Sequence, residues 1–162
     1  DVYKRQVQTL LRAPKLSLRN ARPIGKANKR GRIMLKVTHR DLIDRALAEI
    51  ETLDIDAAEA LLGSDDALFV DLRDPRELQR EGKIPNAFHA PRGMLEFWVD
   101  PSSPYHKEVF ASGKKIVFYC QSGWRSALST KTVQDMGLEN VCHSGDGYRG
   151  WKDSGAATEE VG

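Results

Sequence analysis

The strongest constraint on the fold is an alternation of strand and helix signals that begins at residue 67. An apolar run over residues 67–72 is typical of a buried strand, and Asp74 follows it as a helix N-cap, with Pro75 in the first turn. The same alternation predicts strands at 87–90, 115–119 and 140–143, and helical segments at 94–99, 106–111 and 124–136 and after Gly147. Parallel strands joined by helical crossovers produce this pattern, so we expect an α/β fold.

An amphipathic helical segment, residues 34–54, precedes this alternation. Thr38 and Asp41 have the spacing of a capping box, and apolar residues follow along one helix face: Leu42, Ile43, Ala46, Leu47, Ile50 and Leu53. We expect this face to pack on the domain that follows, because the opposite face mixes acids with bases. Ile55 is predicted to lie in a brief edge strand, and Asp56 is predicted to cap a short helix after it.

The amino-terminal part of the chain is strongly basic. Residues 1–40 contain twelve Lys or Arg and one acidic residue, a net charge of +11, so the rest of the 162-residue chain carries −9. A basic arm can bind nucleic acid or anionic lipid, or act as an organelle import signal. Residues 1–33 offer one aromatic residue, Tyr3, and no apolar helix face, so we expect a disordered extension without a nucleic-acid or membrane partner. Met34 is the first methionine, and we expect native translation to start there.

Length and composition favour one soluble globular domain. Apolar residues make up 40% of the chain and charged residues 30%, and no apolar run approaches the roughly 18 residues of a membrane span. The two cysteines, Cys120 and Cys142, do not form a Cys-x-x-Cys motif and are too few for a disulfide scaffold. We therefore expect a reducing, cytoplasmic location.

The candidate catalytic segment runs from Ile116 to Ser126. An apolar strand delivers Cys120 to its carboxyl end, a short polar loop with Gly123 follows, and a helix begins. Ligands bind outside the carboxyl ends of strands in open α/β sheets. Loop amides, the positive end of the helix and the guanidinium of Arg125 would lower the pKa of this thiol from its free value of about 8.5. We therefore expect Cys120 to be an exposed nucleophile.

The second cysteine is predicted to be an ordinary core residue. Cys142 lies in an apolar strand without a glycine loop or a nearby arginine. Cys142 and His143 do not make a metal site, because the other histidines are scattered and four ligands at characteristic spacings are needed. We therefore expect no metal ion.

Three ordered motifs resemble the rhodanese family of sulfurtransferases. The active loop of that family runs Cys-x-x-x-x-Arg, which here is Cys120 to Arg125. Residues 70–77 with 82–87 look like the family's amino-terminal signature, and residues 147–151 look like its carboxyl-terminal one. Three positions depart from the usual residues and affect turn geometry: Lys83, Asn86 and Asp146.

The resemblance implies a rhodanese-like domain over residues 55–160, with a mostly parallel five-stranded sheet flanked by helices. It also implies double displacement: Cys120 takes the outer sulfur of a donor such as thiosulfate as a persulfide and passes it to cyanide, a small thiol or an acceptor protein. No cofactor is required. Arg125 would hold the anionic donor, and the substrate-binding loop would comprise Gln121, Ser122, Gly123, Trp124 and Ser126.

Several roles have two interpretations. Arg125 could pair with Glu77 instead of an anion, although the loop has no other fixed positive side chain. Asp71 and Arg73 could contact substrate or form an ion pair that braces the loops. Weaker predictions concern residues around the site: Arg92 at the mouth, Trp124 as a pocket wall or against Trp98, Tyr148 and Arg149 at the rim, and Trp151 in the core.

Two other functions compete with sulfur transfer. Cysteine phosphatases and arsenate reductases place five residues between cysteine and arginine to hold a tetrahedral oxyanion, whereas here four separate Cys120 from Arg125. A non-catalytic interaction module, or a persulfide carrier for one partner protein, is the other alternative. The intact Cys120 argues against an inert module but does not separate a carrier from an enzyme.

Overall fold

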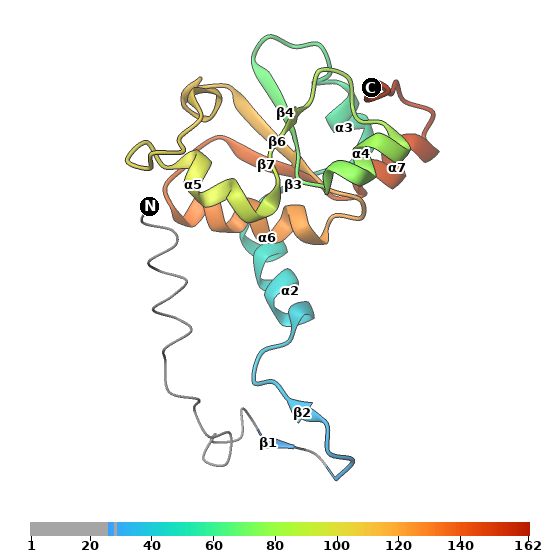
Figure 1. Cartoon of the computed structure of the whole chain (residues 1–162). Coiled ribbons are helices and arrows are strands. Elements are labelled where there is room, and N and C mark those ends of the chain that lie inside the picture. Colours follow the sequence, from blue (N-terminus) through green and yellow to red (C-terminus); the bar gives the residue numbers. More distant parts are fainter. Residues whose placement is uncertain (1–25, 28) are drawn as a thin grey trace, which may run out of the picture. The chain divides into compact units, whose positions relative to one another are not determined.

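The computed structural model describes residues 26–27 and 29–162, and these divide into two units, one that ends at residue 37 and one over residues 38–162 (Figure 1). In the first unit, strand β1 (Lys26–Ala27) pairs antiparallel with β2 (Ile33–Met34). Most of the predicted disordered extension, including Tyr3, lies outside the described residues. The described remainder contains this short hairpin, which was not predicted, and Gly31 supplies a positive φ of 71° between its strands.

The second unit is built on a five-stranded sheet. Its strands are β3 (Glu51–Leu53), β4 (Ala67–Asp71), β5 (Phe88–His89), β6 (Lys115–Tyr119) and β7 (Val141–Ser144). They lie in the order β3-β7-β6-β4-β5, and each neighbouring pair is parallel. The α/β fold and the five-stranded sheet are thus confirmed.

Helices cover both faces of this sheet (Figure 1). They are α2 (His39–Glu49), α3 (Ile55–Glu59), α4 (Pro75–Glu81), α5 (Leu95–Val99), α6 (Trp124–Asp135) and α7 (Gly147–Asp153), with 3-10 turns η2 (Arg92–Met94) and η3 (Glu108–Ala111). Among the helices of the described residues, none is both long and apolar enough to cross a membrane.

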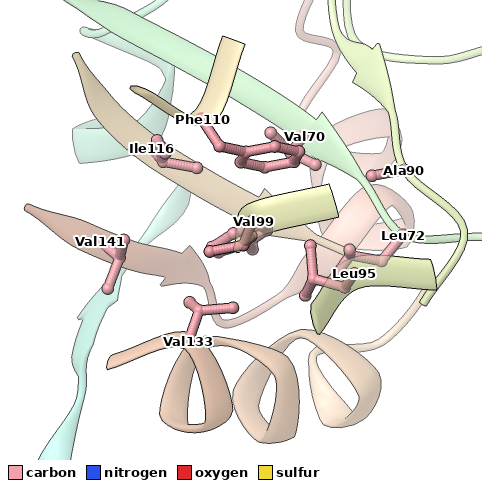
Figure 2. Close-up of a cluster of buried hydrophobic side chains, with 10 residues drawn as sticks. Val70, Leu72, Ala90, Leu95, Val99, Phe110, Ile116, Val133 and Val141 are labelled. Atoms are coloured by element: carbon pink, nitrogen blue, oxygen red, sulfur yellow. The ribbon is translucent and has the colours of Figure 1, made fainter. Parts of the chain in front are cut away.

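The alternation of side chains along the strands gives each face its own core. On one face, residues from β4, β6 and β7 pack with α5, η3 and α6, as Figure 2 shows for Val70, Ile116, Val141, Leu95 and Val133. On the other face, the next residues along the same strands pack with α3 and α7: Phe69, Val117, Tyr119, Cys142, Ala58, Tyr148 and Trp151. A residue's position in its strand therefore decides which helices its side chain meets.

Capping boxes begin two of the helices, and the one at the start of α2 was predicted. In α2 the Thr38 side chain accepts from the Asp41 N–H and the Asp41 carboxylate accepts from the Thr38 N–H. Asp74 caps α4 in the same way, with Pro75 at its start and Gly82 at its end. Asn86, at a position where the family usually has glycine, adopts a positive φ of 60°, so the turn keeps a left-handed residue.

The start of the domain differs from the prediction. Ile55 is not in a strand: it begins α3, and the cap is Asp54, whose side chain accepts from the Ala57 N–H at 2.8 Å. The edge strand is β3, which the sequence placed in the helical segment 34–54. Ile50 takes an extended conformation that ends α2, because the following residues pair with β7. The sheet therefore begins before residue 55.

Helix α2 packs on α6, the helix that follows the active loop. Ile43 and Ala46 are buried, and Ala46 and Ile50 cluster with Ala127 of α6. Leu42 and Leu47, which were predicted on the packed face, are 47% and 41% exposed. Helix α2 thus buries fewer of its apolar residues than the sequence predicted.

Candidate active site

The candidate nucleophile lies directly after β6, on the face covered by α6. Phe118 belongs to the core on that face, and Cys120 is two residues further along the chain. Cys142 belongs to the core of the opposite face, and burial raises the pKa of its thiol to about 12. Because side chains alternate between the two faces of the sheet, the two cysteines lie on opposite faces. The core role predicted for Cys142 agrees with its position.

Two glycines with positive φ hold the loop after Cys120 against the start of α7. Gly123 has φ 83°, and a Cβ there would lie 2.2 Å from the Gly145 carbonyl oxygen. Gly147 has φ 64°, and a Cβ there would lie 2.7 Å from the carbonyl oxygens of Cys120 and Gln121. The Tyr148 N–H donates to the Cys120 carbonyl at 2.8 Å. The active loop and the carboxyl-terminal motif therefore form one tightly packed unit.

Polar groups of α6 surround the sulfur of Cys120. The Ser126 N–H donates to Sγ at 3.4 Å, and the thiol lies 3.6 Å from Ser126 Oγ, to which it donates. The pKa of Arg125 is raised, first by its hydrogen bond to Glu77 and further by an electrostatic interaction with the Cys120 sulfur. These contacts are of the kind that stabilises a thiolate, but the enhanced nucleophilicity of Cys120 stays a prediction.

The thiol is buried, although the sequence predicted an accessible one. Cys120 is 1% exposed. Ser126 forms hydrogen bonds with the sulfur, and the Arg125 guanidinium interacts with it electrostatically. A substrate must therefore displace part of this shell to reach the sulfur.

Arg125 forms a two-pronged ion pair with Glu77 of α4. Its Nη1 and Nη2 donate to the two carboxylate oxygens at 2.7 and 2.8 Å. The guanidinium lowers the pKa of Glu77 to about 2. The side chains are 39% and 19% exposed. The Glu77 pairing that the sequence offered as an alternative is therefore present, next to the sulfur.

A second pair, Asp71 and Arg73, lies at the carboxyl end of β4. Nε and Nη2 of Arg73 donate to the Asp71 carboxylate at 3.0 and 2.7 Å, and both side chains are fully buried. The guanidinium lies 3.9 Å from the centre of the Tyr148 ring and donates to the Gly82 carbonyl. With no exposed surface, the pair has the geometry of the predicted brace, and substrate contact by Asp71 or Arg73 stays a prediction.

Other loop residues point in different directions. The Gln121 side chain accepts from Arg73 at 3.3 Å and donates to Glu81 at 3.0 Å, so both ends of its amide have protein partners. Ser122 is half-buried. Trp124 is 49% exposed and lies against the His39 ring, with Arg40 over it. Binding of substrate by these three residues remains a prediction.

The residues expected around the mouth occupy several environments. Trp98 packs on Phe88 and not on Trp124, and Tyr148 is fully buried instead of lying at the rim. Trp151 is in the core as predicted, and Arg149 is exposed. Arg92 is half-buried, and its Nε has no hydrogen-bond partner among the described residues.

The sequence did not identify His143 as part of the site. It lies on β7 in register with Phe118 of β6 and is 1% exposed, with Nδ1 at 3.1 Å from Ser126 Oγ. Burial lowers its pKa to about 4. Its position two residues after Val141 places it on the α6 face, a signal that becomes usable only once the strand register is known. In residues 26–27 and 29–162, no cluster of three or more His, Cys, Asp or Glu is suited to a metal ion.

Comparison with known protein families gives one match that covers most of the second unit. The family described as the rhodanese-like domain matches residues 54–154. A mouse protein named thiosulfate sulfurtransferase/rhodanese-like domain-containing protein 3 is 26% identical over 98 residues, which are 57% of this chain and 62% of that protein. The chain thus spans less than two thirds of that relative.

Solved structures share the fold. A Rhodopseudomonas palustris protein of unknown function, described as a possible tyrosine phosphatase, is 48% identical with a TM-score of 0.77, and the match covers 79% of this chain and 98% of that one. A homodimeric polysulfide-sulfur transferase from Wolinella succinogenes is 28% identical with a TM-score of 0.56, covering 74% and 85%.

Proposed function

Because the chain belongs to the rhodanese-like domain family, we propose that it is a sulfurtransferase that carries sulfane sulfur as a persulfide on Cys120. The observation that carries the proposal is the arrangement at the end of β6. The Ser126 N–H donates to the sulfur and the Arg125 guanidinium interacts with it electrostatically, in a segment with four residues between cysteine and arginine. Relatives named as sulfur transferases support the same reaction class.

In the first half-reaction, the Cys120 thiolate attacks the outer sulfur of an anionic donor such as thiosulfate. A new S–S bond forms, the S–S bond of thiosulfate breaks, and sulfite leaves with its electron pair. The product is a Cys120 persulfide anion. Hydrogen-bond donors in a closed site stabilise such an anion, and the Ser126 N–H, in the first turn of α6, donates to Sγ.

Arg125 binds the donor by exchanging its carboxylate partner. The guanidinium pairs with Glu77 and also interacts electrostatically with the sulfur, so an incoming anion that replaces Glu77 would be held near Cys120. Both side chains are partly exposed, and ion pairs of that kind contribute only about 0–1 kcal/mol, so the exchange costs little. This step also gives the donor access to a thiol that is otherwise covered.

In the second half-reaction, a nucleophile takes the outer sulfur. Cyanide or a thiolate attacks the terminal sulfur of the persulfide, the S–S bond breaks, and Cys120 leaves as a thiolate. A protein cysteine could accept the sulfur in the same way, so an acceptor protein is one proposed partner. The residues that perform both half-reactions are on the chain, and we propose no metal or cofactor.

Steady-state assays with matched variants test the proposal. With thiosulfate and cyanide, we expect thiocyanate from the wild type and from Cys142→Ser, and none from Cys120→Ser. Replacing cyanide with a small thiol distinguishes an enzyme that serves small acceptors from a carrier dedicated to one protein. Product formation by Cys120→Ser equal to the wild type would rule out the mechanism.

A phosphatase is the second candidate, favoured by the description of the 48% identical Rhodopseudomonas palustris protein. The shorter loop argues against it, because four residues separate Cys120 from Arg125, whereas cysteine phosphatases place five there to hold a tetrahedral anion. Hydrolysis of a phosphate ester that is lost in Cys120→Ser would favour the phosphatase, whereas we expect no such activity.

A further inference from the structure

A chain of hydrogen bonds leads from the buried sulfur to the protein surface. The Cys120 thiol lies 3.6 Å from Ser126 Oγ, Ser126 Oγ lies 3.1 Å from His143 Nδ1, and His143 Nε2 lies 3.0 Å from Thr52 Oγ1. Cys120, Ser126 and His143 are at most 1% exposed. Thr52, on the edge strand β3, is exposed. These hydrogen bonds therefore connect the buried sulfur to an exposed residue.

The sheet register explains why these residues meet. His143 is paired with Thr52 on one side and with Phe118 on the other. Cys120 follows Phe118 by two residues and so projects from the same face, where Ser126 lies in the first turn of α6. Long-range pairing of three strands thus aligns a thiol, two hydroxyls and an imidazole.

We propose that Ser126, His143 and Thr52 form a relay that moves the Cys120 proton to solvent and leaves the Ser126 hydroxyl donating to the thiolate. His143 is a positioning residue that acts on Cys120 through Ser126. The inference rests on the proposed role of Cys120 as the nucleophile.

The proton transfers of the relay balance with these side chains and water alone. The Ser126 hydroxyl, which also has the Gly123 carbonyl as an acceptor at 3.1 Å, turns its proton to His143 Nδ1 and passes it there while the thiol gives its proton to Ser126 Oγ. The Nε2 proton passes to Thr52 Oγ1, whose own proton goes to water. The ring changes tautomer and gains no net charge. Ser126 then accepts from Nδ1–H and directs its new proton to the sulfur anion.

The relay needs a neutral ring, which has one protonated and one free nitrogen. Burial lowers the pKa of His143 to about 4, so the ring is neutral near pH 7. Its hydrogen-bond partners, Ser126 of α6 and Thr52 of β3, are uncharged. A neutral ring stabilises the thiolate by orienting a hydroxyl, which distinguishes this arrangement from a thiolate–imidazolium ion pair.

The charged groups near the sulfur keep their charge over the useful pH range. Arg125 of α6 has a pKa above its ordinary value because of its pairing with Glu77 of α4, and Glu77 has a pKa of about 2. Neither titrates between about pH 5 and about pH 10. A change in the pH profile of Cys120 reactivity after substitution of His143 therefore reports on the relay.

The test measures the rate of Cys120 alkylation by iodoacetamide against pH in the full chain. A Cys142→Ser background leaves one thiol, and this serine can still donate to the Ile116 carbonyl that Cys142 contacts. We expect His143→Leu to raise the midpoint of the profile by about one pH unit, a tenfold slower reaction at neutral pH, because the hydroxyl that donates to the anion is no longer oriented. His143→Asn, which keeps an N–H near the position of Nδ1, should restore most of the shift.

Matched variants separate the relay from a general loss of packing. Ser126→Ala should shift the midpoint at least as far, and adding His143→Leu to it should cause no further shift, because the histidine acts through the serine. Ser129→Ala makes the same change at another buried serine of α6, one without a hydrogen-bond partner among the described residues, and should leave the profile unchanged. Thr52→Val, at an exposed site, should raise the midpoint by a smaller step.

Two outcomes would overturn the relay. One is a midpoint for folded His143→Leu within about 0.2 pH units of the parent, and the other is a shift in the double variant equal to the sum of the single shifts. If His143→Leu does not fold, an unchanged Thr52→Val profile overturns the relay instead. Alkylation needs no sulfur donor, so a His143-dependent profile without sulfur loading from thiosulfate would reject the proposed function and keep the relay.

Discussion

Two arginines at the carboxyl edge of the sheet form similar ion pairs in opposite environments. Arg73 and Asp71 are fully buried, and the guanidinium also lies over Tyr148. Arg125 and Glu77 are 39% and 19% exposed, and Arg125 also interacts with the Cys120 sulfur. The comparison shows that an arginine in a two-pronged pair can be fixed structure or an exchangeable anion site, depending on burial and on its neighbours.

Removal of the buried guanidinium should have the largest effect on stability. Arg73→Ala leaves the Asp71 charge buried without its partner, and we expect a loss of about 3–5 kcal/mol in the free energy of unfolding. Urea unfolding followed by circular dichroism measures this loss. A loss below about 1 kcal/mol would mean that the two pairs do not differ as described.

Removal of the partly exposed guanidinium should instead act on the reaction. For Arg125→Ala we expect sulfur transfer from thiosulfate to fall by about 10²–10³-fold, because the anion loses its charged donor. The free energy of unfolding should change by at most about 1 kcal/mol. Arg125→Lys, which keeps the charge without the two-pronged geometry, should recover part of the rate. Full activity of Arg125→Ala would remove the basis for the anion-binding role.

Acid should weaken the Arg125–Glu77 pair, and the sign follows from the carboxylate. The guanidinium lowers the pKa of Glu77 from 4.5 to about 2 in the folded protein. Its contribution to stability is therefore fully present above about pH 4.5 and is lost as the pH falls toward 2. The stability difference between wild type and Arg125→Ala, from urea midpoints across this range, should shrink with acid. A difference that stays constant down to pH 2 would contradict the pairing.

Arg92 gives the smallest expected effect. It follows β5 at the same edge of the sheet, and its buried Nε has no hydrogen-bond partner among the described residues. We expect Arg92→Ala to raise the KM for thiosulfate by about threefold, with kcat and stability nearly unchanged, as for a weak contact to an anion. Arg45→Ala, at an exposed position of α2, is the matched control. Equal KM values for the wild type, Arg92→Ala and Arg45→Ala would place Arg92 outside the donor site.

Elements with several agreeing local signals were predictable from the sequence. The strand over residues 67–72 and the helix from Pro75 correspond to β4 and α4, because the apolar pattern, the Asp74 cap and the proline in the first turn agree. Strand β3 was not predictable in this way, because Ile50 and Leu53 continue a helical spacing. Pairing with β7, a contact about 90 residues away along the chain, decides its conformation.

The site was predictable where one loop holds its residues, and less so across strands. Cys120, Arg125 and Ser126 come together because they share a strand end and a helix start. The burial of the thiol depends on the packing around the loop, and the position of His143 depends on the register of β6 and β7. Neither the burial of the thiol nor the position of His143 is encoded in a local sequence pattern.

Intact mass of the protein after incubation with thiosulfate tests the central claim most directly. We expect one added sulfur atom on the wild type and on Cys142→Ser, none on Cys120→Ser, and release of that sulfur when cyanide is added. Absence of the added sulfur on the wild type, or its presence on Cys120→Ser, would contradict a persulfide at Cys120.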